Sequence, residues 1–291
     1  FVEEDGQVWQ VVRKGVGPEF LSHRLDAEAL DEVLEHFRRD AVREFALDRA
    51  PLLRMRVCEL GGQCSFLSLV MHHIIGDGWS MQLFFGELLA LYADRRAALP
   101  ALPVQYRDYA VWQQGRDWQA EAEYWRETLK GAPERIALPG DAVYSGRPLA
   151  AGVVRRMLPV ELLEGLRHYA RRKGVSLATL CLTLFSALLY RLTRQQDMVI
   201  GMGVAGRERS ELEGLIGFFI NILPIRVRLD AETEIEELLD QVHRASLEAL
   251  ERQDYPFDLL VREVSASRGG QRESLVNVMF EYQRYSDLQQ I

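Results

Sequence analysis

The stretch Met71–Ser80, MHHIIGDGWS, holds the most informative residues of the chain. Two adjacent histidines end an apolar run that begins at Cys64, and an aspartate follows between two glycines. The apolar run is typical of a strand, and the glycines are typical of a tight turn. Ser80 can cap a helix that starts after the turn. The stretch therefore predicts a strand, a turn and a helix start, with the histidines at the strand end.

Helical and strand patterns are interspersed on both sides of this stretch. Apolar spacing predicts a helix over 27–45, and Gly61-Gly62 predicts a tight turn between strands at 52–60 and 64–73. Further along, we expect helices at 106–114, 119–129, 160–173, 176–192 and 233–253, and strands at 153–158, 197–204, 221–229 and 275–282. The fold class is therefore mixed α/β (α+β), with sheets that are at least partly antiparallel.

Length and composition give the domain organisation. The chain has 291 residues, of which 48% are hydrophobic and 27% charged, enough for more than one core. Residues 138–152 lack periodicity and contain prolines and glycines, which is typical of a linker. We expect an N-terminal lobe over 1–140, a linker over 141–152 and a C-terminal lobe over 153–291.

Charge and cysteine content exclude several classes of protein. The formal net charge is -8 and no basic run stands out, so we expect no nucleic-acid partner. No apolar stretch has the length of a membrane span, so no membrane partner is expected. The three cysteines, Cys58, Cys64 and Cys181, have no zinc-ligand or CxxC spacing. We expect a reducing, cytoplasmic location.

The paired histidines are the first candidates for chemistry. Successive side chains of a strand point to opposite faces, so only one of His72 and His73 faces a given pocket. We favour His73, the last residue before the turn, because an imidazole there can accept a proton and return it. Asp77 either orients the imidazole or pairs with an arginine. Ordinary hydrogen bonding in a partly buried turn is the alternative, and the diverging side chains make a metal site the less favoured interpretation.

Four segments together resemble one family. His72–Gly78, HHIIGDG, matches HHxxxDG, and Tyr106–Trp112, YRDYAVW, is similar to YxDYAVW. Ile216–Asn221, IGFFIN, resembles IGxFVN, and Gln253–Asp258, QDYPFD, resembles QDYPFE. These are motifs of the condensation domains of nonribosomal peptide synthetases, relatives of chloramphenicol acetyltransferase, in the family's order and spacing. Phe1 is similar to the end of the family's LRTxF segment, so we expect the family's first and last segments to lie outside this sequence.

The resemblance implies two chloramphenicol-acetyltransferase-like lobes that form a V-shaped pseudo-dimer with a tunnel between them. Upstream donor and downstream acceptor carrier proteins would deliver thioesters on 4'-phosphopantetheine arms, beside an adenylation domain of the same synthetase. The acceptor amine would attack the donor thioester to form an amide. No tightly bound cofactor and no metal are implied.

The family's residues carry over by position. His73 matches the catalytic histidine, which acts either as a general base or as the group that positions the amine. His72 belongs to the same motif, Asp77 is expected to be structural with Arg207 as its partner, and Gly78 is expected to leave room beside the tunnel. The tunnel-lining candidates are Trp79, Ser80 and Asn221.

Two other functions remain to be separated from condensation. A related epimerisation domain uses the same histidine, but Gly78-Trp79-Ser80-Met81 differs from that group's VSWR continuation, and GVAGRE at 203–208 differs from EGHGRE. A catalytically silent module that docks carrier proteins or a tailoring enzyme is the second, although such members usually have a damaged histidine motif. Arg252 and Ile222 depart from the family's usual residues, which affects the expected acceptor preference.

Overall fold

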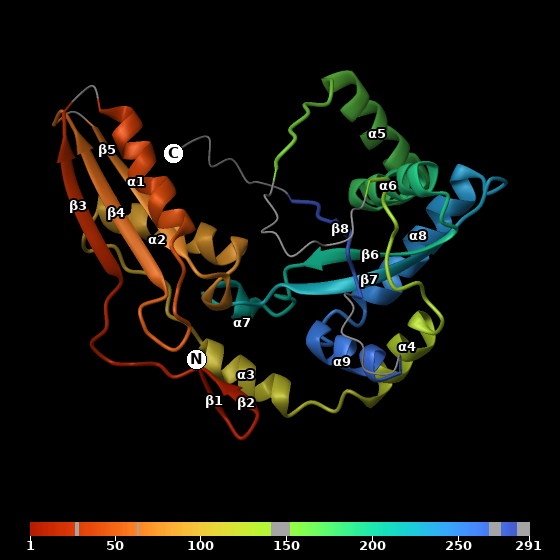
Figure 1. The fold of residues 1–291 in the computed structure, drawn as a ribbon, viewed down its shortest axis with the longest axis horizontal. Helices are drawn as coiled ribbons and strands as arrows, with labels where there is room; N and C mark the ends of the chain where they lie inside the picture. Colours follow the sequence, from red (N-terminus) through yellow and green to blue (C-terminus); the bar gives the residue numbers. More distant parts are fainter. Residues whose placement is uncertain (27–28, 63, 141–151, 268–274, 284–291) are drawn as a thin grey trace. The chain divides into compact units, whose positions relative to one another are not determined.

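The structure is a computed structural model, and it describes residues 1–26, 29–62, 64–140, 152–267 and 275–283. The chain divides into two compact units. The first contains residues 1–113 together with 207–219, and the second contains 114–206 together with 220–291. Each unit combines strands with helices (Figure 1), so the mixed α/β class is confirmed.

The first unit is built on a three-stranded sheet in the order β3-β4-β5, in which β3 and β4 are parallel and β4 and β5 antiparallel. Helix α1 connects the parallel pair and packs against β4 and β5 (Figure 1). The elements of this unit are β1 Val2–Glu4, β2 Gln7–Trp9, β3 Glu19–Leu25, α1 Leu30–Val42, β4 Leu53–Leu60, β5 Cys64–Met71, the 3-10 turn η1 His73–Ile75, α2 Gly78–Ala93, nearly all of α3 Tyr106–Gln114, and α7 Ser210–Glu213.

The expected hairpin between β4 and β5 is confirmed, with Leu60 paired to Cys64 and Leu53 to Met71. Gly61 and Gly62 have φ angles of 57° and 69°, a conformation that glycine adopts without steric cost. The hairpin fixes where β5 ends, and therefore where the histidine motif begins.

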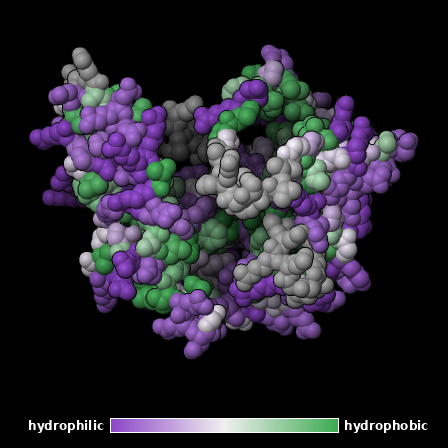
Figure 2. Space-filling model, in the orientation of Figure 1, coloured by the Kyte–Doolittle hydropathy of each residue, from purple (hydrophilic) through white to green (hydrophobic). Residues whose placement is uncertain are grey.

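Charged residues take part in the packing between α1 and the sheet. Every second residue of β4 is buried, and two of these are Arg54 and Arg56. Arg56 donates to both carboxylate oxygens of Asp40 on α1, at 2.5 and 2.9 Å. The opposite side of α1 is mostly hydrophilic (Figure 2). The bidentate ion pair satisfies charges that burial would otherwise penalise.

The second unit has a three-stranded sheet in the order β7-β6-β8 and holds the largest hydrophobic core cluster. Helix α8 packs against β7 and α6, and α9 packs against α4 and β7 (Figure 1). Its elements are α4 Gln119–Leu129, α5 Val160–Lys173, α6 Leu177–Thr193, β6 Asp197–Val204, β7 Asn221–Arg228, α8 Ile235–Leu250, α9 Phe257–Ser267 and β8 Met279–Phe280.

Several helix boundaries follow from local capping. Ser176, the first residue of the helix expected over 176–192, caps α6, because its hydroxyl accepts from the Thr179 amide at 2.9 Å. Gly174 ends α5 with φ 70°, as expected. The helix expected from residue 233 begins two residues later: α8 starts at Ile235, and the hydroxyl of Thr233 does not cap it but donates to Asp230 at 2.8 Å.

Two predicted strands differ from the structure. Residues 153–158 form no regular element, and Val153 and Met157 are 79% and 95% exposed. No described strand pairs with these residues, so their backbone lacks the hydrogen-bonding partner that a strand needs. The last strand is limited to Met279–Phe280, since only these residues pair with β6.

The lobe boundaries stay a prediction. The contact units place residues 114–140 with the second unit and 207–219 with the first, whereas the expected lobes meet at 141–152. Most of that linker, 141–151, lies outside the described residues. Within the part of the chain that the structure describes, no single helix is long and apolar enough to cross a membrane. Helices α5 and α6, bent by 106° relative to each other, have the length and composition of a broken span only when taken together.

Candidate active site

The two adjacent histidines are separated by a change of backbone conformation. β5 ends at Met71, and His73 opens the 3-10 turn η1. His72 caps this turn, because its Nδ1 accepts from the Ile74 amide at 3.1 Å. The expectation that both histidines belong to the strand is therefore wrong, and strand alternation does not divide their roles. The two histidines differ in role because the His72 ring nitrogen is bound to a backbone amide.

His73 is exposed and lies at the start of the turn. Its ring is perpendicular to that of Phe218, with 5.2 Å between centroids and 79° between planes. Among the described residues, none forms a hydrogen bond or ion pair with the His73 ring. Both ring nitrogens are therefore available to a substrate, which is the condition for accepting a proton or orienting an amine.

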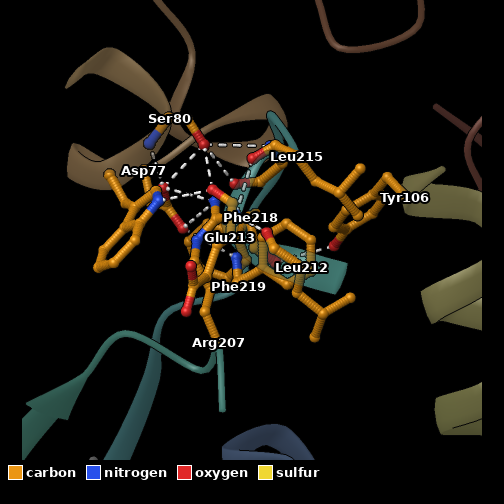
Figure 3. A network of polar contacts seen from close by, with 11 residues as sticks. Asp77, Ser80, Tyr106, Arg207, Leu212, Glu213, Leu215, Phe218 and Phe219 are labelled. Carbon is orange, nitrogen blue, oxygen red and sulfur yellow. Dashed lines mark hydrogen bonds and ion pairs between the residues drawn. The ribbon is translucent and has the colours of Figure 1, made fainter. Parts of the chain in front are cut away.

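Asp77 caps α2, correcting the expectation that Ser80 would do so. Its Oδ1 accepts from the backbone amide of Ser80 at 2.8 Å and from the Ser80 hydroxyl at 2.7 Å. Its Oδ2 accepts from the Phe219 amide at 3.1 Å (Figure 3). The carboxylate thus satisfies one amide at the helix N-terminus and one in a segment that follows 142 positions later.

Arg207 is the partner of Asp77. Its Nη2 lies 3.2 Å from Asp77 Oδ1 and 3.1 Å from the Ser80 hydroxyl. Its Nη1 donates to the carbonyls of Leu212 and Leu215, each at 2.7 Å (Figure 3). Arg207 is only 7% exposed, so it is a buried partner and not a solvated surface residue. Its planar fork joins the motif loop to the backbone of the 207–219 segment, a geometry that a lysine cannot reproduce.

Ser80 is fully buried, at 0% exposure, and its hydroxyl is the centre of the network (Figure 3). The oxygen accepts from the Gly217 amide at 3.1 Å and from Arg207. The single hydroxyl proton has two acceptors in reach, Asp77 Oδ1 at 2.7 Å and the Gly217 carbonyl at 2.9 Å, and it serves one at a time. A fully buried hydroxyl does not line a passage, so the expectation of Ser80 as a tunnel-lining residue is corrected.

The charges of this network are stable near neutral pH. Burial alone raises the pKa of Asp77, but hydrogen bonds from Ser80 and Phe219 and the charge of Arg207 bring it below the ordinary value of 3.8. Burial lowers the pKa of Arg207 from its ordinary value, which is so high that the guanidinium stays protonated. Asp77 and Arg207 therefore face each other as a full ion pair.

Within the first unit, the segment 216–219 is held through its backbone. Ser80 contacts both the amide and the carbonyl of Gly217, and the Tyr106 hydroxyl donates to the Phe218 carbonyl at 2.9 Å. Burial raises the pKa of Tyr106, which keeps this hydroxyl protonated. A Cβ on Gly217 would lie 2.7 Å from Cε2 of Tyr106 and 2.9 Å from Cε2 of Phe219, so glycine permits the close approach.

The other candidate residues from the sequence, Gly78, Trp79 and Asn221, lie outside the hydrogen-bond network of Asp77, Ser80 and Arg207. Gly78 is exposed, and a Cβ built on it would have no atom within 4 Å. Trp79 is 41% exposed, and its indole N–H donates to the Glu213 carbonyl at 2.8 Å. Asn221 belongs to the second unit, where its amide donates to the carbonyls of Gln253 and Tyr255, at 2.8 and 2.7 Å. A tunnel-lining role for Trp79 and Asn221 stays a prediction.

Sequence reasoning missed Phe218 and the hydroxyl of Tyr106. The YRDYAVW helix contributes to a hydrophobic core, since Tyr106 and Tyr109 pack on the cluster of Leu212, Leu215 and Phe219. Helical spacing gave no sign that the Tyr106 hydroxyl also reaches a backbone carbonyl. For a metal, no group of three or more His, Cys, Asp or Glu side chains within the described ranges has a suitable arrangement.

Comparison with known proteins agrees with the motifs. Residues 1–291 match the family described as the condensation domain. Bacitracin synthase 1 of Bacillus licheniformis is 34% identical over 97% of this chain, which spans only 5% of that protein. The first condensation domain of the calcium-dependent antibiotic synthetase, solved with a substrate analogue, gives a TM-score of 0.70 at 25% identity, covering 90% of this chain and 60% of that one.

A further solved structure is the X-domain from teicoplanin biosynthesis, with a TM-score of 0.78 and 26% identity over 88% of this chain and 59% of the X-domain chain. The X-domain was also solved in complex with OxyB. The likeness in fold to these solved structures and the family match over the whole sequence agree. The chain belongs to the condensation-domain family of nonribosomal peptide synthetases.

Proposed function

We propose that the chain forms an amide bond between a donor acyl or peptidyl thioester and an acceptor aminoacyl thioester, both carried on phosphopantetheine arms. The donor would arrive on an upstream carrier protein and the acceptor on a downstream one, next to an adenylation domain of the same synthetase. The observation that carries the proposal is the exposed ring of His73, which has no hydrogen bond or ion pair to any described residue and lies on a turn that the buried Asp77–Arg207 pair supports.

The chemistry balances without any other reactant. The acceptor nitrogen attacks the donor carbonyl carbon, the C–N bond forms, and the C–S bond breaks. The proton leaves the amine and reaches the departing thiolate. His73 acts on this proton as a general base, or hydrogen-bonds the amine and orients it. Since thioester aminolysis is downhill, holding the two ends in attack geometry supplies much of the rate.

The test uses the protein with two loaded carrier proteins and mass spectrometry of the carrier-bound product. His73→Ala should reduce the rate of amide formation by about 100-fold or more, the usual range for a lost acid–base group. His168→Ala, which removes an exposed histidine of α5, is the matched control and should retain full activity. Equal rates in the two variants would reject the proposal.

A docking module is the second candidate, favoured by the similarity to the X-domain. It predicts binding of carrier proteins or of a tailoring enzyme with no product from loaded carriers. An epimerase would instead exchange the α-proton of a single loaded aminoacyl group. The same assay in deuterated buffer separates the three, because it reports product, deuterium in the substrate, or neither.

A further inference from the structure

The backbone on either side of Phe218 is fixed at three consecutive residues. Gly217 binds Ser80 through both its amide and its carbonyl, at 3.1 and 2.9 Å. The Phe218 carbonyl accepts from Tyr106 at 2.9 Å, and the Phe219 amide donates to Asp77 at 3.1 Å. Because each of these four backbone groups has a side-chain partner within hydrogen-bonding distance, the direction in which the Phe218 side chain leaves the backbone is determined.

The residues that fix this segment also fix the turn that carries His73. Asp77 caps α2 two positions after η1 ends, and its two carboxylate oxygens bind Ser80 on one side and Phe219 on the other. His73 and Phe218 are therefore attached to two backbone segments that share one anchor. Their ring contact, at 5.2 Å and 79°, follows from that shared anchor.

The ring of His73 has no other described partner that restricts its rotation. An exposed side chain without a hydrogen bond samples several staggered rotamers, and most of them direct the imidazole away from a given reacting atom. An edge-to-face contact with an aromatic ring favours one orientation and leaves both ring nitrogens free. A hydrogen-bonding partner at the same place would occupy one of these nitrogens. Phe218, 40% exposed, thus suits the task of holding the ring.

We propose that Phe218 is a positioning residue, whose ring, fixed by Tyr106, Ser80 and Asp77, holds the His73 imidazole in its reactive orientation. This assignment deepens the proposed amide-forming function and rests on it. In this role Phe218 does not touch the reacting atoms. Its removal should therefore lower the rate of the chemical step and leave substrate binding unchanged.

The first test compares three substitutions in the carrier-protein assay. Phe218→Leu should lower kcat about tenfold with KM within twofold, and Phe218→Tyr should restore kcat, because it keeps the ring. Phe45→Leu is the matched control: Phe45 makes the corresponding edge contact with His72, at 6.0 Å, and its loss should change kcat less than twofold. An unchanged kcat in Phe218→Leu, or a rise in KM alone, would overturn the assignment.

The second test is a double-mutant cycle with His73→Ala. If Phe218 acts through His73, Phe218→Leu should have no further effect in the His73→Ala background. A second tenfold loss there would mean that Phe218 acts on the substrate or the fold, and would overturn the proposal.

The third measurement does not depend on activity. In proton NMR of the whole chain, Phe218→Leu should shift the His73 ring-proton resonances, identified by their absence in His73→Ala, because the neighbouring ring current is lost. Phe45→Leu should leave them in place. Unshifted resonances would overturn the ring contact, whereas absence of product from the unmodified protein would overturn the proposed function instead.

Discussion

The carboxylate of Asp77 and the guanidinium of Arg207 form a buried ion pair with 3.2 Å between Oδ1 and Nη2, although 130 positions separate them in the chain. The pair joins the loop after His73 to the 207–219 segment, so it determines where the His73 ring and its neighbour Phe218 lie. The contribution of this ion pair to the free energy of unfolding can be measured separately from catalysis.

Asp77→Asn should destabilise the protein strongly. The substitution leaves the guanidinium of Arg207 buried without its counter-charge, a loss of about 3 to 5 kcal/mol in comparable buried pairs. Chemical denaturation measures the change in the free energy of unfolding. Asp94→Asn is the control, because Asp94 is an exposed carboxylate that accepts from the Arg96 amide, and it should change stability by no more than about 0.5 kcal/mol. Loss of activity without loss of stability would assign Asp77 a direct chemical role.

The stabilisation by Asp77 should disappear in acid. Because the pKa of Asp77 is lowered on folding, the unfolded state binds more protons at this group, and its contribution is present above the ordinary value of 3.8 and lost as the pH falls through the folded value. The difference in unfolding free energy between the unmodified protein and Asp77→Asn should be constant near neutral pH and shrink below pH 3.8. The contributions of the other carboxylates cancel in this difference, because both proteins contain them. A constant difference throughout would contradict the lowered pKa.

Gly78→Ala tests whether a substrate passes close to the backbone of the motif. The added methyl group has no atom within 4 Å and Gly78 has no positive φ, so stability should be unchanged. If substrate runs beside this residue, kcat/KM should fall about tenfold, or ~1.4 kcal/mol in the barrier. Gly86→Ala, in the same helix and equally open, is the control and should keep full activity. Full activity in Gly78→Ala would mean that the substrate path lies elsewhere.

Gly217→Ala should lower stability by about 1 to 3 kcal/mol, the usual cost of an overpacked site. Its Cβ would meet the rings of Tyr106 and Phe219, both held in a packed cluster. Thermal unfolding compared with Gly165→Ala, where the added methyl group meets open space, measures the effect. Equal midpoints in the two variants would show that the Tyr106 ring moves aside at no cost.

Local patterns predicted the parts of the fold that depend on neighbouring residues. Gly61-Gly62 indicated the turn between β4 and β5, and Ser176 indicated the start of α6, because turns and caps use hydrogen bonds within a few positions. The strand pattern of 153–158 was misleading, since a strand needs a partner that its own residues do not encode. The cap of α2 was placed at Ser80 instead of Asp77 because several residues of that stretch are good caps.

The sequence by itself determined the family, the mixed α/β class and the choice of His73 and Asp77 as the residues to examine, because motif spacing and hydrophobic periodicity are properties of the linear chain. Only the tertiary structure decided that Ser80 is a buried hydrogen-bonding centre and that Phe218 meets the ring of His73. The Ser80–Gly217 contact joins residues 137 positions apart and the Asp77–Arg207 pair joins residues 130 positions apart, and such distances close only when packing and buried electrostatics bring the segments together.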